Sequence, residues 1–181
     1  MEARRWRRNS ANSASIAQGR KAHRELLERY TFVPVCRVAY RPTPHKGGAG
    51  MPVVLIVEDE THVLILAEAV LEGTGYEVVS AATLTEALAI VDSDHQLDLL
   101  FTDLGLGNEI EGGLVVADRA TKSRPGLPVL YTSGRELTDG LKALFVEPYG
   151  FLAKPYTVEQ LTNAHADLLG RTPSATKSSI E

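Results

Sequence analysis

Five short apolar runs alternate with amphipathic segments between residues 52 and 170, and this alternation most limits how the chain can fold. The run PVVLIV at 52–57 is continuously apolar, which is typical of a strand buried on both faces of a sheet. With short connections and right-handed crossovers, the pattern predicts an α/β fold built on a doubly wound, five-stranded parallel sheet. The predicted strands lie at 52–57, 76–82, 98–102, 127–134 and 149–155, and the predicted helices at 61–73, 83–91, 113–121, 136–145 and 157–169.

Two threonines stand where predicted helices begin. Thr83 is followed three residues later by Glu86, which is the spacing of a capping box. Thr157 precedes the last helical pattern, and Gly170 follows it. We therefore expect Thr157 to cap this helix and Gly170 to end it.

Charge divides the chain into two regions. Residues 1–50 hold 11 Lys and Arg against 3 Asp and Glu, whereas residues 51–181 hold 8 against 20. So sharp a split indicates regions with different roles. We expect residues 1–50 to form a basic, disordered extension, residues 51–170 to form the folded domain, and residues 171–181 to form a disordered tail.

The basic extension admits several interpretations. Four arginines surround Trp6, as in arms that bind nucleic acid or an anionic membrane surface, and as in organelle transit peptides. A start codon assigned in error before Met51 would produce the same kind of leader, and so would a flexible tail without a specific role. The sequence leaves these alternatives open.

The rest of the composition excludes few functions. Cys36 is the only cysteine, so the chain forms no intrachain disulfide. No apolar stretch approaches the ~18 residues of a membrane-spanning helix. We expect a cytoplasmic protein that does not enter a membrane.

Polar residues follow the ends of four predicted strands, and parallel strands place these ends at one edge of the sheet. Glu58 and Asp59 follow the first strand, Asp103 the third, Thr132 the fourth and Lys154 the fifth. Converging carboxylates suit Mg²⁺, while an ammonium and a hydroxyl can donate to phosphoryl oxygens. Because an aspartate can accept a phosphoryl group, these residues predict an aspartyl-phosphate site with Asp103 as the acceptor.

In this order and spacing, the motifs VEDE, the strand-end Asp, TS and KP resemble the receiver domain of two-component response regulators. The resemblance covers residues 52–170 and implies the flavodoxin-like (βα)5 receiver fold. It implies that Glu58 and Asp59 hold Mg²⁺, together with Asp103 and the backbone carbonyl of Gly105. It also implies that Asp103 is the residue that becomes phosphorylated.

The same resemblance assigns roles near the last two strands. Thr132 matches the switch hydroxyl that moves toward the phosphoryl group, with Ser133 as a turn former beside it. Lys154 matches the family's lysine, joined to Pro155 by a cis bond. Phe151 matches the aromatic switch position, although a plain core role for this ring also remains open.

Three features depart from the family pattern. Gly107 stands where the loop after Asp103 usually carries a proline, and either Gly112 or Gly113 could be the glycine that opens the next helix. We therefore expect a loop more flexible than in most members. Glu58 replaces the commoner aspartate and reaches further.

The resemblance implies a bacterial phosphorylation switch. A histidine kinase or histidine phosphotransfer protein would phosphorylate Asp103 with Mg²⁺, and the change would alter binding to a partner. The expected output surface, and a homodimer interface, is the fourth helix, fifth strand and fifth helix. Only 11 residues follow residue 170, so we expect a stand-alone receiver without a DNA-binding domain. It would catalyse only its own phosphorylation and dephosphorylation.

Three other interpretations compete with this one. A phosphatase of the haloacid-dehalogenase class needs a second aspartate two residues after the first, where this chain has Gly105. A flavodoxin-type module binds phosphate after its first strand, where the acids at 58–60 would repel it. A receiver that has lost phosphorylation and acts by binding alone is the remaining alternative.

Overall fold

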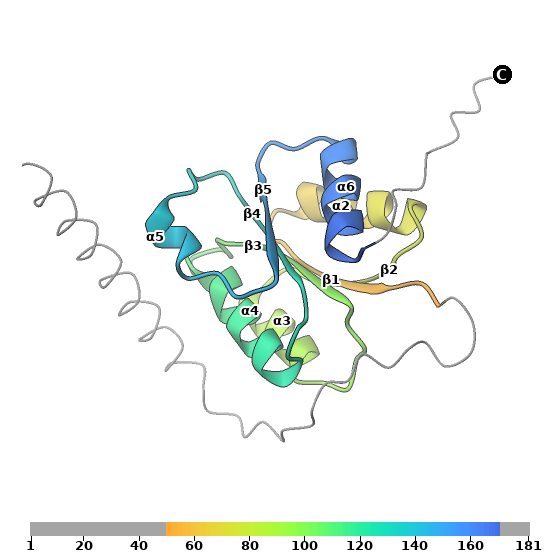
Figure 1. Cartoon of the computed structure of the whole chain (residues 1–181), viewed down its shortest axis with the longest axis horizontal. Helices are drawn as coiled ribbons and strands as arrows, with labels where there is room; N and C mark the ends of the chain where they lie inside the picture. The colour runs from red at the N-terminus through yellow and green to blue at the C-terminus, as the bar shows by residue number, and fades with distance from the viewer. Residues whose placement is uncertain (1–49, 171–181) are drawn as a thin grey trace, which may run out of the picture.

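The computed structural model describes residues 50–170, so the predictions for residues 1–49 and 171–181 lie outside the described residues. Strands and helices alternate along the chain as predicted (Figure 1). The strands are β1 (Val53–Val57), β2 (Glu77–Ala81), β3 (Leu99–Asp103), β4 (Val129–Ser133) and β5 (Tyr149–Ala153). The helices are α2 (Thr61–Gly73), α3 (Leu84–Val91), α4 (Gly112–Ser123), α5 (Asp139–Lys142) and α6 (Val158–Leu168).

The five strands form one parallel sheet in the order β2-β1-β3-β4-β5. This arrangement confirms the predicted doubly wound sheet. Because β2 and β3 lie on opposite sides of β1, the strand order reverses there, and the polar ends of β1 and β3 become neighbours. Across the next pair, Asp103 is in register with Thr132.

Helices cover both faces of the sheet (Figure 1). On one face, α2 and α6 pack against a buried cluster that includes Ile56, Phe101 and Leu161. On the other face, α3 and α4 pack against a larger cluster that includes Leu100 and Val116. Burial on both faces explains why β1 is apolar without alternation.

Helix α5 is much shorter than predicted. It spans Asp139–Lys142, whereas the sequence pattern indicated a helix over 136–145. Thr138 caps its start by accepting a hydrogen bond from the Leu141 N–H at 3.2 Å. Gly140 weakens a helix by about 1 kcal/mol, and Pro148 disfavours helical backbone at the residue before it. The apolar residues that suggested a longer helix pack against the core from turns and loop instead.

The predicted caps form at both threonines, with one difference. Thr157 makes a complete capping box with Gln160 at the start of α6. Thr83 accepts a hydrogen bond from the Glu86 N–H, but the Glu86 carboxylate accepts from the N–H of Ala82. In a capping box the Glu86 carboxylate would accept a hydrogen bond from the N–H of Thr83. Here the donor is the preceding residue, so the predicted box forms only in part.

No helix within residues 50–170 is long and apolar enough to cross a membrane.

Candidate functional site

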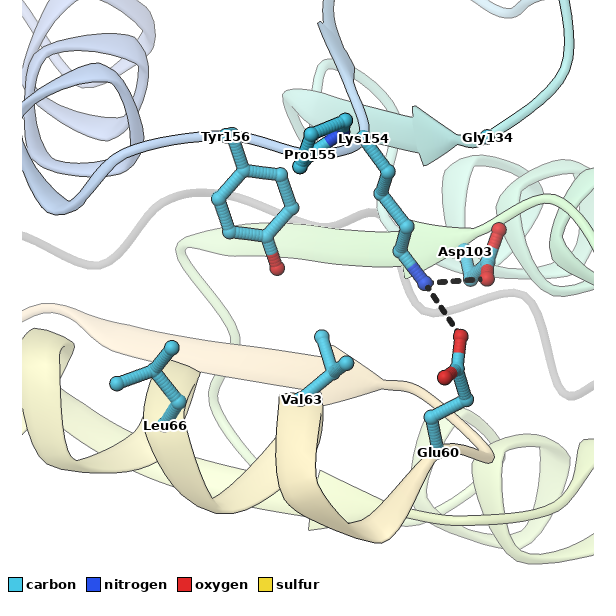
Figure 2. A pocket seen from close by; sticks show the side chains of 8 residues that line it. All are labelled: Glu60, Val63, Leu66, Asp103, Gly134, Lys154, Pro155 and Tyr156. Carbon is cyan, nitrogen blue, oxygen red and sulfur yellow. Dashed lines mark hydrogen bonds and ion pairs between the residues drawn. The ribbon is translucent and has the colours of Figure 1, made fainter.

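Three predicted site residues meet where β1, β3 and β5 leave the sheet. The Lys154 Nζ lies 2.7 Å from Asp103 Oδ2 and 2.7 Å from Glu58 Oε2. It also lies 3.7 Å from Glu60 Oε1 (Figure 2). The side chain of Glu58 is 2% exposed and that of Lys154 is 14% exposed, so these charges interact with little screening by water.

Burial and charge act in opposite directions on these groups. Burial raises the pKa of Glu58 above its ordinary value, and the hydrogen bond and charge of Lys154 offset only part of this effect. Burial alone would lower the pKa of Lys154, but Asp103 and Glu58 outweigh it, so this pKa lies above its ordinary value. The lysine therefore stays positively charged and balances carboxylates that would otherwise repel one another.

A cluster of carboxylates at this edge could hold a cation. Oxygen atoms of Glu58, Glu60 and Asp103 lie within 4.8 Å of one another. The predicted metal set named Asp59 in place of Glu60. The Asp59 carboxylate instead accepts a hydrogen bond from the Gly107 N–H at 3.0 Å.

Sequence analysis did not include Glu60 among the predicted site residues. In the structure Glu60 occupies the cap position of α2 but makes no capping hydrogen bond. Its carboxylate turns toward Lys154 instead. A run of three acids at a strand end was the available signal, but it did not indicate which of them point into the site.

Several hydrogen bonds connect the loop after Asp103, residues 104–111, internally and to its neighbours. Leu106 and Glu109 exchange both backbone hydrogen bonds of a small antiparallel bridge, and Gly107 adopts a φ of 58° that favours glycine. Asp59 holds this loop on one side, as described above. On the other side, Arg135 donates to the Ile110 carbonyl at 2.7 Å. Gly105, the predicted carbonyl ligand, donates its N–H to Asp103 Oδ1 at 3.3 Å.

Gly113 is the glycine that the close approach of α4 and β3 requires. A Cβ at Gly113 would collide with the Asp103 carbonyl oxygen and lie 2.9 Å from Thr102 Oγ1. A Cβ at Gly112 would meet only the side chain of Leu106, at 3.1 Å. The start of α4 therefore packs directly on the backbone of Asp103.

The two hydroxyls at the end of β4 differ in their bonding. Thr132 is 1% exposed, and its hydroxyl donates to the Leu152 carbonyl on β5 at 2.8 Å. Ser133 Oγ accepts a hydrogen bond from the Arg135 N–H at 3.0 Å, which does not use the hydroxyl proton. Ser133 also directly precedes Gly134, which lines the same hollow as Asp103 and Lys154.

Phe151 belongs to a cluster of aromatic rings between β4, β5 and the segment that contains α5. The ring of Phe145 stacks on Tyr131 with centroids 4.1 Å apart and lies 6.2 Å from Phe151. Tyr149 contacts Phe145 edge-on at 5.1 Å. Sequence analysis identified Phe151 but missed the other rings, because they come from separate segments.

A hollow of about 430 Å³ adjoins the charged residues (Figure 2). Asp103, Glu60 and Lys154 form its polar wall, and the bond from Lys154 to Pro155 is cis. Its apolar wall is formed by Val63 and Leu66 of α2 and by Tyr156, which lies opposite them. The hollow thus combines a net negative wall with an apolar one.

Comparison with known proteins agrees with this geometry. The family model of the response regulator receiver domain matches residues 54–166. The chain belongs to the receiver domain family. Apart from Val53, the five parallel strands and the strand-end acids, lysine and hydroxyls lie within this matched region.

The relatives include transcriptional regulatory proteins and a sensor kinase. The transcriptional regulatory protein PmrA of Pectobacterium parmentieri is 33% identical over 132 residues, which cover 71% of this chain and 57% of PmrA. The transcriptional regulatory protein GlrR of Escherichia coli K12 is 31% identical over 124 residues, which cover 68% of this chain. This receiver spans only 27% of GlrR, so the activities of such whole proteins do not transfer directly.

Solved receiver structures show the same fold. A response regulator receiver protein from Sinorhizobium medicae superposes with a TM-score of 0.61 at 27% identity, covering 66% of this chain and 95% of that one. The receiver domain of the hybrid histidine kinase CckA has a TM-score of 0.54 at 30% identity, covering 65% of this chain and 98% of that one.

Proposed function

We propose that this receiver is a phosphorylation switch in which Asp103 accepts a phosphoryl group from a histidine kinase or a histidine phosphotransfer protein. The observation that carries the proposal is the 2.7 Å contact between Lys154 Nζ and Asp103 Oδ2. It places an ammonium beside the carboxylate that would be modified, within an acidic cluster at the sheet edge.

The proposed step is a transfer between two proteins. An Asp103 carboxylate oxygen attacks the phosphorus of the donor's phosphohistidine and forms an O–P bond as the N–P bond breaks. The electron pair of that bond stays on the imidazole nitrogen. Lys154 stabilises the charge on the phosphoryl oxygens, because its ammonium already lies at the acceptor.

The donor set fits Mg²⁺. Glu58, Glu60 and Asp103 provide carboxylate oxygens within 4.8 Å of one another, which is the chemistry that a hard cation prefers. Asp59 and the Gly105 carbonyl remain proposed ligands beside this cluster. When bound, Mg²⁺ would neutralise charge on the phosphoryl oxygens.

We assign the switch hydroxyl to Ser133 in preference to Thr132. The Thr132 hydroxyl is buried in a bond to β5, and breaking that bond would leave the Leu152 carbonyl without its donor. The proton of Ser133 is not used by its bond with Arg135. A shift of the β4 end toward the phosphoryl group would move the aromatic cluster around Phe151, and with it the segment that contains α5.

The proposed output surface is formed by α5, β5 and α6, where a homodimer or another partner would bind. We propose that the receiver works in the cytoplasm. Its own phosphorylation and dephosphorylation would be the only reactions it catalyses.

Intact mass measurement tests the proposed acceptor. We expect incubation with acetyl phosphate and Mg²⁺ to add one phosphoryl group to the full chain and none to Asp103→Asn. Asp167→Asn is the matched control, because Asp167 is an exposed aspartate on α6. Phosphorylation that persists in Asp103→Asn would show that another residue is the acceptor. No phosphorylation of the parent by this donor or by a phosphorylated phosphotransfer protein would favour a receiver that acts by binding alone.

A further inference from the structure

Tyr156 carries a buried hydroxyl that the proposed reaction leaves unused. Its ring packs edge-on against Phe101 with centroids 6.2 Å apart, on the face of the sheet that α2 and α6 cover. The ring also lines the hollow beside Asp103 (Figure 2). The hydroxyl finds no hydrogen-bond partner among residues 50–170. A buried hydroxyl without a partner costs free energy, so an arrangement of the site that gives it an acceptor is favoured.

Glu58 is an acceptor on the same face of the sheet. Ile56 and Phe101 are paired in register on β1 and β3, and Glu58 follows Ile56 by two residues, so both side chains leave β1 toward α2 and α6. Lys154 Nζ lies 2.7 Å from Glu58 Oε2, and no hydroxyl or backbone N–H within residues 50–170 donates to this oxygen. The carboxylate is 2% exposed, so water cannot replace the lysine.

The proposed reaction draws Lys154 away from Glu58. The ammonium lies 2.7 Å from Asp103 Oδ2 as well as from Glu58 Oε2, so it bridges the two carboxylates. A phosphoryl group on Asp103 would offer new charged acceptors to this ammonium. If Lys154 turned to them, Glu58 Oε2 would be buried without its partner, which is strongly unfavourable.

Tyr156 is placed to supply the missing donor. It follows Lys154 by two residues, in the segment that joins β5 to α6. Burial, and after it the charge of Glu58, raise the pKa of Tyr156 to about 12. The hydroxyl therefore keeps its proton beside the carboxylates, and this proton is not used in any other hydrogen bond among the described residues.

We propose that Tyr156 is a positioning residue whose hydroxyl donates to Glu58 Oε2 when Lys154 leaves this oxygen for the phosphoryl group. The exchange of donors holds Glu58 in place and lets the ammonium move. This role in the reaction rests on the proposed function, whereas the exchange itself can be tested without phosphorylation.

A double-mutant cycle followed by urea unfolding tests the exchange in the full chain. Lys154→Met removes the ammonium, so the Tyr156 hydroxyl should donate to Glu58 in this background. We expect Tyr156→Phe to leave the urea midpoint of the parent unchanged or slightly higher, because the hydroxyl has no partner there. In Lys154→Met the same change should lower the midpoint by about 0.5 M or more, because it removes a hydrogen bond to a buried carboxylate.

Tyr149→Phe is the matched control for this cycle. Tyr149 lies in the aromatic cluster at the opposite end of β5, so its hydroxyl should not respond to Lys154. We expect Tyr149→Phe to shift the midpoint equally in both backgrounds. An equal effect of Tyr156→Phe in the parent and in Lys154→Met would overturn the exchange. Coupling as large for Tyr149 as for Tyr156 would also overturn it, because it would reflect a general loss of stability.

Phosphorylation kinetics tests the positioning role without a change at Lys154, and so decides it even if Lys154→Met does not fold. With acetyl phosphate and Mg²⁺, we expect Tyr156→Phe to lower the initial rate about tenfold at unchanged stability, and Tyr149→Phe to stay within about twofold of the parent. A Tyr156→Phe rate equal to the parent would reject the positioning role. Coupling between Tyr156 and Lys154 in a chain that takes up no phosphoryl group would reject the proposed function and leave the exchange intact.

Discussion

Thr132 and Ser133 show how adjacent hydroxyls can have different roles. Thr132 Oγ1 holds β4 to β5 through the Leu152 carbonyl, and Ser133 Oγ accepts from the backbone of the following loop. The first bond is part of the buried sheet, whereas the second lies where the chain leaves it. The proposed phosphoryl group on Asp103 could therefore recruit the Ser133 hydroxyl without disturbing the sheet.

Two single variants separate these roles. We expect Ser133→Ala to lower the rate of Asp103 phosphorylation about ten- to a hundredfold, because a hydrogen bond to a charged group contributes ~1.5–3 kcal/mol. We expect Thr132→Val to keep that rate within about twofold but to lower the free energy of unfolding by ~1–3 kcal/mol. Intact mass over time and urea unfolding measure the two effects. A larger loss of rate in Thr132→Val would return the switch role to Thr132.

His165 is a buried titratable group away from the site. Its Nδ1 donates to the Leu161 carbonyl at 2.8 Å, and its ring packs edge-on against Phe101 with centroids 5.1 Å apart. The Nε2 atom is buried and has no hydrogen-bond partner among the described residues. Burial therefore lowers the pKa of His165 to about 4.

This low pKa predicts a loss of stability in acid. Between pH 4 and 6.5 the unfolded chain binds a proton at His165 and the folded chain does not, so stability falls as pH falls through this range. The loss amounts to about 3 kcal/mol by pH 4. Urea unfolding at several pH values should show that the free energy of unfolding depends less steeply on pH in His165→Leu than in the parent. His62→Gln, a change at an exposed histidine, should keep the parent slope, and equal slopes in all three proteins would contradict this account.

At the scale of elements, the junction between β3 and α4 positions Asp103, the proposed acceptor. The N-terminus of α4 packs so closely on the Asp103 carbonyl that only glycine fits at Gly113. The Gly113 N–H also donates to the Leu104 carbonyl at 3.1 Å. Helix α4 therefore fixes the backbone from which the Asp103 side chain extends.

Alanine substitutions test this packing. We expect Gly113→Ala to lower the free energy of unfolding by about 3 kcal/mol, because the added methyl group meets backbone atoms that cannot move aside. Gly73→Ala is the control, because Gly73 lies in a helix with open space around it, and it should be neutral or stabilising by up to ~1 kcal/mol. Thermal or urea unfolding measures both. A Gly113→Ala protein as stable as the parent would show that α4 can shift away from β3.

At the scale of the whole molecule, the sheet concentrates negative charge at one edge. The ends of β1 and β3 place three carboxylates within 4.8 Å, and one lysine from β5 only partly compensates for them. Their mutual repulsion opposes folding, so a cation that binds this edge stabilises the entire domain.

Magnesium should therefore raise the stability of the protein. If the dissociation constant is about 1 mM, 10 mM Mg²⁺ adds about 1.4 kcal/mol to the free energy of unfolding. The measurement is urea unfolding with and without Mg²⁺ at constant ionic strength. Asp103→Asn removes one carboxylate and should respond less. An equal response in both proteins would mean that the cation acts elsewhere on the acidic surface.

The sequence by itself determined the layered fold and the edge that carries the site. Alternation of apolar runs with helical patterns depends on local periodicity, and the chain order brings Asp103 and Lys154 to one edge of any parallel sheet so wound. The Thr157 cap was equally predictable, because it involves residues three apart.

Only the tertiary structure decided which side chains meet. Glu60 rather than Asp59 turns toward Lys154, Thr132 is bonded to β5, and Gly113 alone lies against the Asp103 backbone. Tertiary packing also decided the short α5 and the aromatic cluster around Phe151, because the sequence of this segment predicted a longer helix. Each outcome depends on side-chain direction and packing between segments far apart in the chain, which the spacing of residues along one segment does not specify.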